Sequence, residues 1–557
     1  MKLNPLTPRI AAALFLLLGS LSVSTAKAQL LTEKGNFSRA DSLRGYLSPL
    51  RTCYDINYYH LDVKLNIEDR SISGSNEFRF TATTDFTKLQ FDLFANLTVE
   101  KVLYKGQSLP FTREFNAVFV DFPQIKKGSK ESFTVFYSGH PTIAKRAPWD
   151  GGLVFTTDDA GKPWVATACQ GIGASIWWPN KDHQSDEVDS VLISISVPKG
   201  MKDVSNGRLR KVTELKDGYT RFDWFVANPI NNYSVSMNVG NYIHIEDKYT
   251  GEKGPLSIDY WVLAQHKEQA KKQFDANVKP MLKSFEYWFG PYPFYEDGYK
   301  LVEAPHLGME HQSAVAYGNK FLNGYSGRDL SGTGWGMKWD FIVVHESGHE
   351  WFGNNITSKD IADMWVHESF TNYSEGLFVE SQFGKAAGQE YIIGTRKAIL
   401  NDRPIQGVFG VNNEGSGDMY YKGGNLLNMI RSILNDDVKW RDILRGLNKE
   451  FYHQTVDGTQ IIAYINKQSG LNLDKVFDQY LRRSKPPILE IAFQDGKPSA
   501  RWIAETPGFD MPVRLRVKGG EYITVKPGTR FRPIELPGAT KENIEVDPNF
   551  YIGQLIY

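Results

Sequence analysis

The feature that most constrains this chain is the segment VVHESGHEWFGN, residues 343–354. His345 and His349 are four positions apart, which on a helix is about one turn, so both imidazoles leave the same face and can bind one metal ion. Glu346 directly follows the first histidine and can reach a water molecule on that ion. The apolar residues FIVV, 341–344, directly precede His345 and can pack this helix into a hydrophobic core. Because a bare H-E-x-x-H pattern also arises by chance, the interpretation needs a further ligand.

Glu368 supplies that ligand. The segment IADMWVHESFTNYSEGLFVE, residues 361–380, predicts a second helix, antiparallel to the first and joined to it by a loop. Hydrolytic zinc sites use three protein ligands and keep a fourth position for water. Two histidines and a glutamate therefore favour zinc, although this ligand set does not exclude other divalent metals. His367 points about 100° away from Glu368 on the helix and is expected to pack or to support the site. The alternative is a buried polar pair on a core helix.

This arrangement predicts hydrolysis of an amide bond. The metal would polarise a bound water and the scissile carbonyl, while Glu346 accepts the water proton and passes it to the leaving amine. Negative charge that develops on the carbonyl oxygen then needs a hydrogen-bond donor opposite the metal. Spacing alone does not select that donor among 27 tyrosines.

The first residues predict a secretory leader. Lys2 and Arg9 precede the apolar run 10–23, and Ala26-Lys27-Ala28 provides a cleavage site. The run is too short to span a bilayer comfortably, which takes about 20 apolar residues, so a membrane anchor is the weaker alternative. We therefore expect an exported chain, periplasmic or secreted, with no transmembrane segment after cleavage. Cys53 and Cys169 would then lie in an oxidising compartment, and the sequence leaves open whether they form a disulfide.

Composition is that of a soluble globular chain, and it excludes several other classes. The 557 residues contain 64 basic and 64 acidic side chains, which gives no electrostatic case for a nucleic-acid partner. Two cysteines are too few for a disulfide framework or a structural zinc site built on cysteine.

Three regions with different patterns of apolar and polar residues follow the leader, and they predict an α+β multidomain fold. Alternating apolar and polar residues up to about residue 250 predict a large, antiparallel β domain. Helical spacing then dominates to Pro486-Pro487, and short β runs return after it, typical of a small β-sandwich. The expected divisions are 1–28 for the signal peptide, 29–250 for the N-terminal β domain, 251–486 for the mainly α catalytic domain and 487–557 for the C-terminal β-sandwich.

The arrangement HESGHEWFGN…W..ES…Y.E over residues 345–375 resembles the gluzincin aminopeptidases of the aminopeptidase N and leukotriene-processing hydrolase type. The similarity extends over roughly 54–557 and is closest to short members with three domains, which lack a large C-terminal helical domain. It implies a β-rich N-terminal domain, a thermolysin-like catalytic domain and a β-sandwich. It also implies one zinc ion per chain, held by His345, His349 and Glu368, with Glu346 as the catalytic base.

The resemblance also implies a substrate site. The family's G-x-M-E-N motif is matched by Gly308, Met309 and Glu310, of which Glu310 would hold the free α-amino group of a peptide. A carboxylate suits that role because it pairs with an ammonium and disfavours blocked N-termini. His311 stands where asparagine is usual, a departure that bears on how the substrate backbone is held.

Three further residues match the family pattern. In MYYKGG, the register Y-x-K-G selects Tyr420 as the tyrosine that stabilises the oxyanion, and Tyr421 is expected to pack. Gln170 matches a residue that lines the amine pocket, although the WWPNKD that follows it departs from the usual pattern. Glu375 matches a carboxylate that orients a metal ligand. The basic run 482–485 ends a predicted helix and is typical of a solvated surface.

These inferences predict an exported zinc metallo-aminopeptidase that hydrolyses N-terminal residues from peptides with a free N-terminus. One alternative is a zinc endopeptidase of thermolysin type, which shares the two histidines and the glutamate. Another is a peptide-binding protein without catalysis on the same fold. The preferred N-terminal residue and the oligomeric state do not follow from the sequence.

Overall fold

The structure, a computed structural model, describes residues 37–557, and residues 39–557 form one unit of the chain. The predicted leader, residues 1–28, lies outside the described residues. Within the described part, no helix is both long and apolar enough to cross a membrane.

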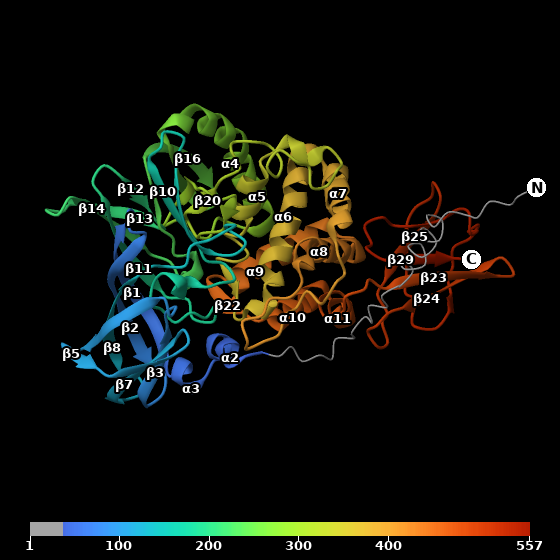
Figure 1. The fold of residues 1–557 in the computed structure, drawn as a ribbon. Helices are drawn as coiled ribbons and strands as arrows, with labels where there is room; N and C mark the ends of the chain where they lie inside the picture. Colours follow the sequence, from blue (N-terminus) through green and yellow to red (C-terminus); the bar gives the residue numbers. More distant parts are fainter. Residues whose placement is uncertain (1–36) are drawn as a thin grey trace, which may run out of the picture. The chain divides into compact units, whose positions relative to one another are not determined.

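A large twisted sheet is the main element of the N-terminal region (Figure 1). Its apolar side chains alternate with polar ones because successive residues of a strand face opposite sides. Phe78 and Phe80 are buried, for example, whereas Arg79 between them is exposed. In spatial order the strands are β13 (Arg208–Glu214), β14 (Tyr219–Val226), β11 (Ser190–Pro198), β1 (Tyr54–Asn66), β2 (Ser71–Ala82), β8 (Lys130–Gly139), β4 (Leu97–Tyr104) and β5 (Gln107–Leu109).

One pair in this sheet is parallel, although the sequence predicts an antiparallel domain. Strand β1 pairs antiparallel with β2 on one side but parallel with β11 on the other. The segment between β1 and β11 is long enough for the crossover that a parallel pair requires. The other neighbouring pairs are antiparallel, so the predicted character of the domain is otherwise confirmed.

An aromatic cluster holds a second layer of strands against this sheet. The second layer contains β3 (Phe86–Asp92), β7 (Ala117–Ile125) and β6 (Phe111–Glu114). Phe133 on β8 has ring contacts with Phe78 and with Phe91 of the second layer, at centroid separations of 4.4 and 6.4 Å. Phe122 of β7 meets Phe133 at 5.4 Å. Aromatic rings of this size supply much of the buried area between the layers.

A second sheet carries the chain into the catalytic region. Its order is β16 (Tyr242–Gly251), β17 (Gly254–Leu263), β18 (Tyr299–Glu303), β20 (Val315–Tyr317) and β19 (Gly308–Met309). The expected boundary at residue 250 falls at the turn of the β16–β17 hairpin, whose two strands pair in the same sheet. The short edge strand β19 matters most for function because it holds Gly308 and Met309.

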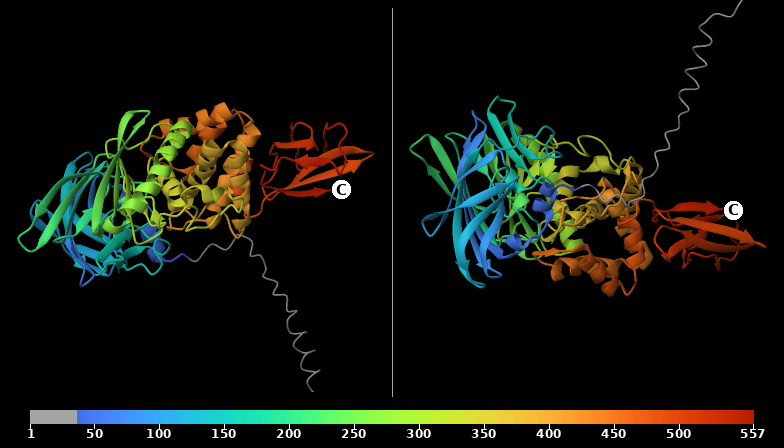
Figure 2. Two further views of the ribbon diagram at one scale, coloured as in Figure 1. Left: turned by 90° about the horizontal axis from the view of Figure 1, so that it is seen from above. Right: turned by 60° about the horizontal axis from the view of Figure 1, so that its bottom comes forward.

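Helices make up most of the chain between residues 267 and 481, as predicted (Figure 2). The first, α4, ends at Phe289, and Gly290 takes a positive φ of 97° directly after it, consistent with the predicted stop at Gly290-Pro291. The helices are α4 (Lys267–Phe289), α5 (Phe341–Gly348), α6 (Trp365–Phe383), α7 (Lys385–Gly394), α8 (Tyr421–Leu434), α9 (Asp437–Glu450), α10 (Gly458–Ser469) and α11 (Asp474–Leu481).

The C-terminal region is built from two small sheets, as the sequence predicts. One has the order β27 (Arg532–Pro533), β24 (Lys497–Ile503), β23 (Ile488–Gln494) and β29 (Gly553–Ile556). The other has the order β26 (Ile523–Val525), β25 (Val513–Val517) and β28 (Ile544–Val546). Trp502 is buried in this region, and its indole donates a hydrogen bond to Met511 O at 2.9 Å.

The two cysteines are free thiols in the structure. Cys53 and Cys169 are both buried, and neither forms a disulfide. Burial raises the pKa of the Cys53 thiol to about 11. Both side chains therefore act as small apolar groups in the core.

We expect Phe133→Ala to lower the free energy of unfolding of the N-terminal region by about 3–5 kcal/mol, because it removes a buried ring from the centre of the aromatic cluster. Urea denaturation followed by tryptophan fluorescence measures the change. Phe115→Ala is the matched control, since the Phe115 side chain is 56% exposed. An equal effect of both substitutions would contradict the assignment of Phe133 to the interlayer core.

Candidate metal centre and catalytic cavity

Asp340 begins the helix that carries the H-E-x-x-H residues. Its carboxylate accepts hydrogen bonds from Ile342 N and Val343 N at 3.1 and 3.4 Å, which caps α5. The helix ends at Gly348, and His349 follows it with helical dihedral angles. The two histidines therefore keep the spacing of one turn, although the helix itself is short.

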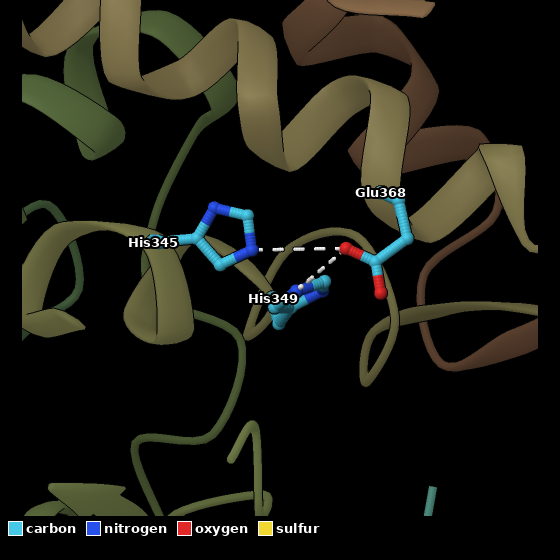
Figure 3. Close-up of side chains that lie close together, drawn as sticks. All are labelled: His345, His349 and Glu368. Carbon is cyan, nitrogen blue, oxygen red and sulfur yellow. Dashed lines mark ion pairs between the residues drawn. The ribbon is translucent and has the colours of Figure 1, made fainter. Parts of the chain in front are cut away.

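The second predicted helix is present as α6, preceded by the short 3₁₀ helix Ile361–Asp363. Glu368 lies in the first turn of α6. This places its side chain beside the end of α5 (Figure 3).

Three donor atoms converge between these helices. Glu368 Oε2 lies 3.7 Å from His345 Nε2 and 3.4 Å from His349 Nε2. Figure 3 shows both rings directed toward this carboxylate oxygen. The side chains are almost entirely buried. The structure thus brings together the three residues that the sequence predicts as metal ligands.

Partners on the far side of each ligand fix its orientation. His345 Nδ1 lies 2.8 Å from Glu375 Oε1, and His349 Nδ1 lies 3.0 Å from Phe352 O. These contacts turn the Nε2 atom of each ring toward the centre, which is the arrangement that metal-binding histidines usually show. Glu375 therefore occupies the predicted position of a carboxylate that orients a ligand, and the hydroxyl of Tyr391 holds it at 2.7 Å.

The donor set fits a divalent cation. Glu368 Oε2 is buried and has no hydrogen-bond partner among the described residues, a state that is costly for a carboxylate oxygen unless a cation compensates it. Donor separations of 3.4 and 3.7 Å leave room for an ion about 2 Å from each atom. Two imidazoles and a carboxylate are ligands that zinc accepts readily.

Glu346 lies beside this centre on α5. Its carboxylate, Glu310 and His349 offer ligand atoms within 4.8 Å of one another, so two further carboxyl groups gather around the same point. Burial raises the pKa of Glu346 to about 7, and the neighbouring Glu310 charge adds to this effect. A carboxylate of that kind can accept a proton near neutral pH.

Gly308 allows β19 to pass close to Glu346. A Cβ atom at Gly308 would lie 2.9 Å from Glu346 Oε1 and 2.8 Å from a methyl group of Ile342. A side chain there would force the Glu346 or Ile342 side chain to move. The glycine of the substrate motif is therefore required by the close approach of strand and helix.

Glu310 follows β19 and is 2% exposed. Its Oε1 atom has no hydrogen-bond partner among the described residues, and the hydroxyl of Tyr233 lies beside the carboxyl group. Asn354 donates a hydrogen bond to Glu310 O at 2.9 Å and fixes the backbone. The site thus holds a buried carboxylate with one oxygen that accepts no hydrogen bond from the described residues.

His311 turns away from the cavity. Its ring is fully buried and is not among the side chains that line the cavity. Burial lowers the pKa of its imidazole to about 3, so the ring is neutral. The replacement of asparagine by His311 therefore changes the packing behind Glu310 and places no new group against a substrate.

Tyr420 stands directly before α8, with its ring packed against His345 at a centroid separation of 5.9 Å. The glycines that follow allow this approach. A Cβ atom at Gly423 would lie 1.9 Å from Ser369 Oγ, and one at Gly424 would lie 2.2 Å from Asn372 Oδ1. Helix α8 therefore crosses α6 at close range and brings Tyr420 to the metal ligands.

Gln170 comes from the loop after β10 (Pro163–Ala168) in the N-terminal region. Its Nε2 atom donates a hydrogen bond to Glu368 Oε1 at 2.9 Å. The residue therefore lines the cavity and at the same time orients a metal ligand. The sequence resemblance suggests only the first of these roles.

A cavity of about 850 Å³ opens over these groups. It lies within the usual size range of small-molecule sites. All of the predicted site residues contribute to its lining: Gln170, Gly308, Met309, Glu310, His345, Glu346, His349, Glu368, Glu375 and Tyr420. Tyr421, expected to pack, also lines it.

The predictions missed two kinds of lining residue. Tyr325, Leu330 and Phe341 give the cavity an apolar wall, and Arg403 and Glu414 are charged. Arg403 and Glu414 belong to the irregular segment 399–416, which precedes Tyr420. That segment has no hydrophobic periodicity, so its only signal is its position before the tyrosine.

Comparison with known proteins agrees with this geometry. A model of the peptidase family M1 domain matches residues 273–480, which include the metal-centre residues and Tyr420. The chain carries an M1 peptidase domain. The resemblance to gluzincin aminopeptidases is thereby confirmed, and the matched residues begin within α4 and end within α11.

Relatives of the M1 domain include aminopeptidases of moderate similarity. Probable aminopeptidase 1 of Sulfurisphaera tokodaii is 20% identical over 459 residues, which cover 78% of this chain and 54% of that protein. Aminopeptidase N of Lactobacillus helveticus is 25% identical over 313 residues, which cover 52% of this chain and 35% of that protein. The chain thus spans about half or less of the length of these relatives.

Solved structures share the fold. An M1 zinc metallopeptidase from Deinococcus radiodurans has a TM-score of 0.64 and 20% identity, and the match covers 78% of this chain and 95% of that chain. A mutant of an M1 zinc metallopeptidase from the same organism, bound to a Tyr-Ser-Ala substrate, also has a TM-score of 0.64. These likenesses establish the architecture around the M1 domain.

We expect Glu375→Gln to weaken metal retention by about 10- to 100-fold, because the substitution removes the charged partner of His345 Nδ1. Metal content after dialysis against graded chelator measures this directly. Glu390→Gln is the control, since Glu390 is exposed and bonds to Trp335 away from the centre. Equal metal retention in both variants would show that Glu375 does not support the ligand.

Proposed function

We propose that this chain is a zinc metallo-aminopeptidase that removes N-terminal residues from peptides. One observation carries the proposal: the buried carboxylate of Glu310 has a free oxygen and shares a cavity with Glu346 and the metal ligands. The M1 domain and the aminopeptidases among the relatives support the same reaction class.

Glu310 fixes the substrate by its amine. A free peptide N-terminus carries an ammonium group at neutral pH, and a charge-assisted hydrogen bond to a buried carboxylate is among the strong polar contacts in proteins. An acetylated N-terminus lacks that charge and would leave Glu310 unpaired. The site therefore discriminates against blocked peptides through the cost of an unpaired buried charge.

Glu346 moves the proton. It lies close enough to Glu310 and His349 for the three to share one small volume, so it can reach a water molecule between them. As a base with a pKa raised to about 7, it takes the water proton and returns it to the nitrogen of the leaving peptide.

Tyr420 stabilises the oxygen of the scissile carbonyl. Burial raises the pKa of its hydroxyl well above the ordinary value, so the group stays protonated and can donate a hydrogen bond. Its ring is fixed against His345, so the hydroxyl is positioned before the reaction begins.

Zinc, when bound by His345, His349 and Glu368, would supply a Lewis acid for the water and the carbonyl. We propose one ion per chain, because the two potential ligand sets in the described residues share His349.

The aminopeptidase reaction is tested with aminoacyl fluorogenic substrates and with peptides that carry free or acetylated amines. We expect cleavage of free-amine substrates only, and a loss of kcat by about 100-fold or more in Glu346→Gln because the base is removed. Glu310→Gln should lower kcat/KM on free-amine substrates by about 100-fold, since it removes one partner of a buried charge pair.

Glu246→Gln is the control for these variants, because its side chain is 82% exposed and is not among the residues that line the cavity. Cleavage of acetylated peptides at internal bonds would instead establish a thermolysin-type endopeptidase. Peptide binding and metal binding without turnover of any substrate would establish a binding protein.

We also propose that the chain is exported, to the periplasm or to the medium. The proposal is supported by the basic residues, the apolar run and the Ala26-Lys27-Ala28 site of the first residues.

Expression in a bacterial host with an intact secretion system tests export. We expect the protein in the periplasmic or extracellular fraction, with Gln29 as its first residue by N-terminal sequencing, because cleavage follows Ala28. An Ala26→Asp, Ala28→Asp double variant should keep the leader. A full-length chain in the cytoplasm of the unmodified strain would contradict the proposal.

A further inference from the structure

The charges that line the cavity are strongly unequal. Arg403 is the one lysine or arginine among the described lining residues. The carboxyl groups of the lining are Asp150, Glu310, Glu346, Glu368, Glu375 and Glu414. A lone guanidinium in such a cavity is an obvious place for an anion to bind.

Three of these carboxyl groups already have partners in the protein, and one of them is Glu368, whose Oε1 accepts a hydrogen bond from Gln170. Asp150 accepts hydrogen bonds from Lys145 N and Arg146 N at 2.7 and 2.8 Å, so its carboxylate is bound by the backbone of its own loop. Glu375 is held between His345 and Tyr391. The negative charge that faces a substrate therefore gathers at the centre, on Glu310 and Glu346, with Glu414 near Arg403.

The backbone around Arg403 is fixed. Ser416 N donates a hydrogen bond to Pro404 O at 2.8 Å, which pairs the two arms of the segment 399–416. Asp418 accepts a hydrogen bond from Leu400 N at 2.8 Å. Arg403 Nη2 donates to Gly415 O at 3.0 Å, so the side chain has a defined direction across the segment.

Most of the hydrogen-bonding capacity of Arg403 is unused. The guanidinium has five N–H donors, of which one bonds to Gly415. The side chain is exposed, and within the described residues it makes no ion pair at 4.0 Å or less. Arginine is well suited to bind a carboxylate through two parallel hydrogen bonds.

Arg403 and the metal ligands lie within electrostatic reach of the same group. Burial raises the pKa of Glu414, the charge of Glu368 raises it further, and the charge of Arg403 opposes them. The Glu414 carboxyl group therefore experiences the charges of both Glu368 and Arg403. Glu310, Glu414 and Arg403 line the same cavity, so one ligand of sufficient length can contact both Glu310 and the guanidinium.

We infer that Arg403 binds the C-terminal carboxylate of a short peptide whose amine is held by Glu310. The inference rests on the proposed function and names its substrate class: short peptides with a free C-terminus. Such a peptide carries a positive charge at one end and a negative charge at the other, which matches Glu310 and Arg403. The cavity of about 850 Å³ is suited to a ligand of a few residues.

The basic run 482–485 does not compete for this role. Arg482 donates to Gln406 Oε1 at 2.9 Å, and both Arg482 and Arg483 pair with Asp478. Neither lines the cavity. Arg482 therefore provides a control for the loss of an exposed guanidinium.

The test uses peptides from dipeptide to hexapeptide with one N-terminal residue, each as the free acid and as the C-terminal amide. Calorimetry on the metal-loaded Glu346→Gln variant gives the dissociation constants, and turnover by the unmodified enzyme gives kcat/KM. We expect the free acid to bind about five- to tenfold more tightly than the amide at one length, because a charge-assisted bond is lost in the amide.

Three further substitutions assign the preference. Arg403→Gln should reduce the ratio of acid to amide affinity to about one at every length, and Arg403→Lys should restore part of it. Glu414→Gln should increase the ratio, because it removes a carboxylate that repels the peptide C-terminus. Arg482→Gln should leave both the ratio and the turnover of aminoacyl substrates unchanged.

Equal affinity for acids and amides at every length would overturn the inference, as would a preference that persists in Arg403→Gln. Turnover without any acid preference would overturn the inference alone and leave the aminopeptidase proposal intact. An acid preference in binding without turnover would support Arg403 as the anchor while overturning the proposed reaction.

Discussion

The structure depends on the burial of charged groups where α5 meets α6. His345, His349 and Glu368 are almost fully buried, and Glu368 Oε2 has no hydrogen-bond partner among the described residues. Removing such groups from water costs several kcal/mol per charge unless they are paired. The outer contacts of Glu375, Phe352 and Gln170 offset part of that cost, and a divalent cation would offset the remainder. Folding of this region and metal binding are therefore expected to be coupled.

This constraint explains why glycine recurs near the centre. Strand β19 reaches Glu346 only because Gly308 has no side chain, and α8 reaches α6 only because of Gly423 and Gly424. Segments whose backbones approach this closely hold their side chains rigidly, because close-packed protein interiors have low compressibility. Glu346 and Tyr420 are thus positioned by packing, as the proposed reaction requires.

The sequence allowed the metal centre and the three regions to be predicted, and the reasons are local. Helical spacing places His345 and His349 on one face, and alternation identifies the strands. The contact of Gln170 with Glu368 joins residues 198 positions apart, which no local pattern encodes and only a family resemblance suggested. The parallel pairing of β1 with β11 depends on a crossover that spacing does not show. Arg403 and Glu414 lie in an irregular segment, where the sequence has no hydrophobic periodicity from which a structure could be predicted.

The N-terminal β region contributes to the surroundings of Glu310 and Glu368 as well as to stability. Gln170 comes from it, and Tyr233 of the same region lies beside Glu310. The segment that follows Glu310 is also held from this side: Asn206 donates to Gln312 O at 2.7 Å, and Gly207 N donates to Ser313 Oγ at 2.9 Å. An exopeptidase needs a wall that stops the chain beyond its amine, and an isolated catalytic domain would leave that end open. Under the proposed function, the contacts between the two regions make the metal centre specific for peptides whose free N-terminus binds beside Glu310.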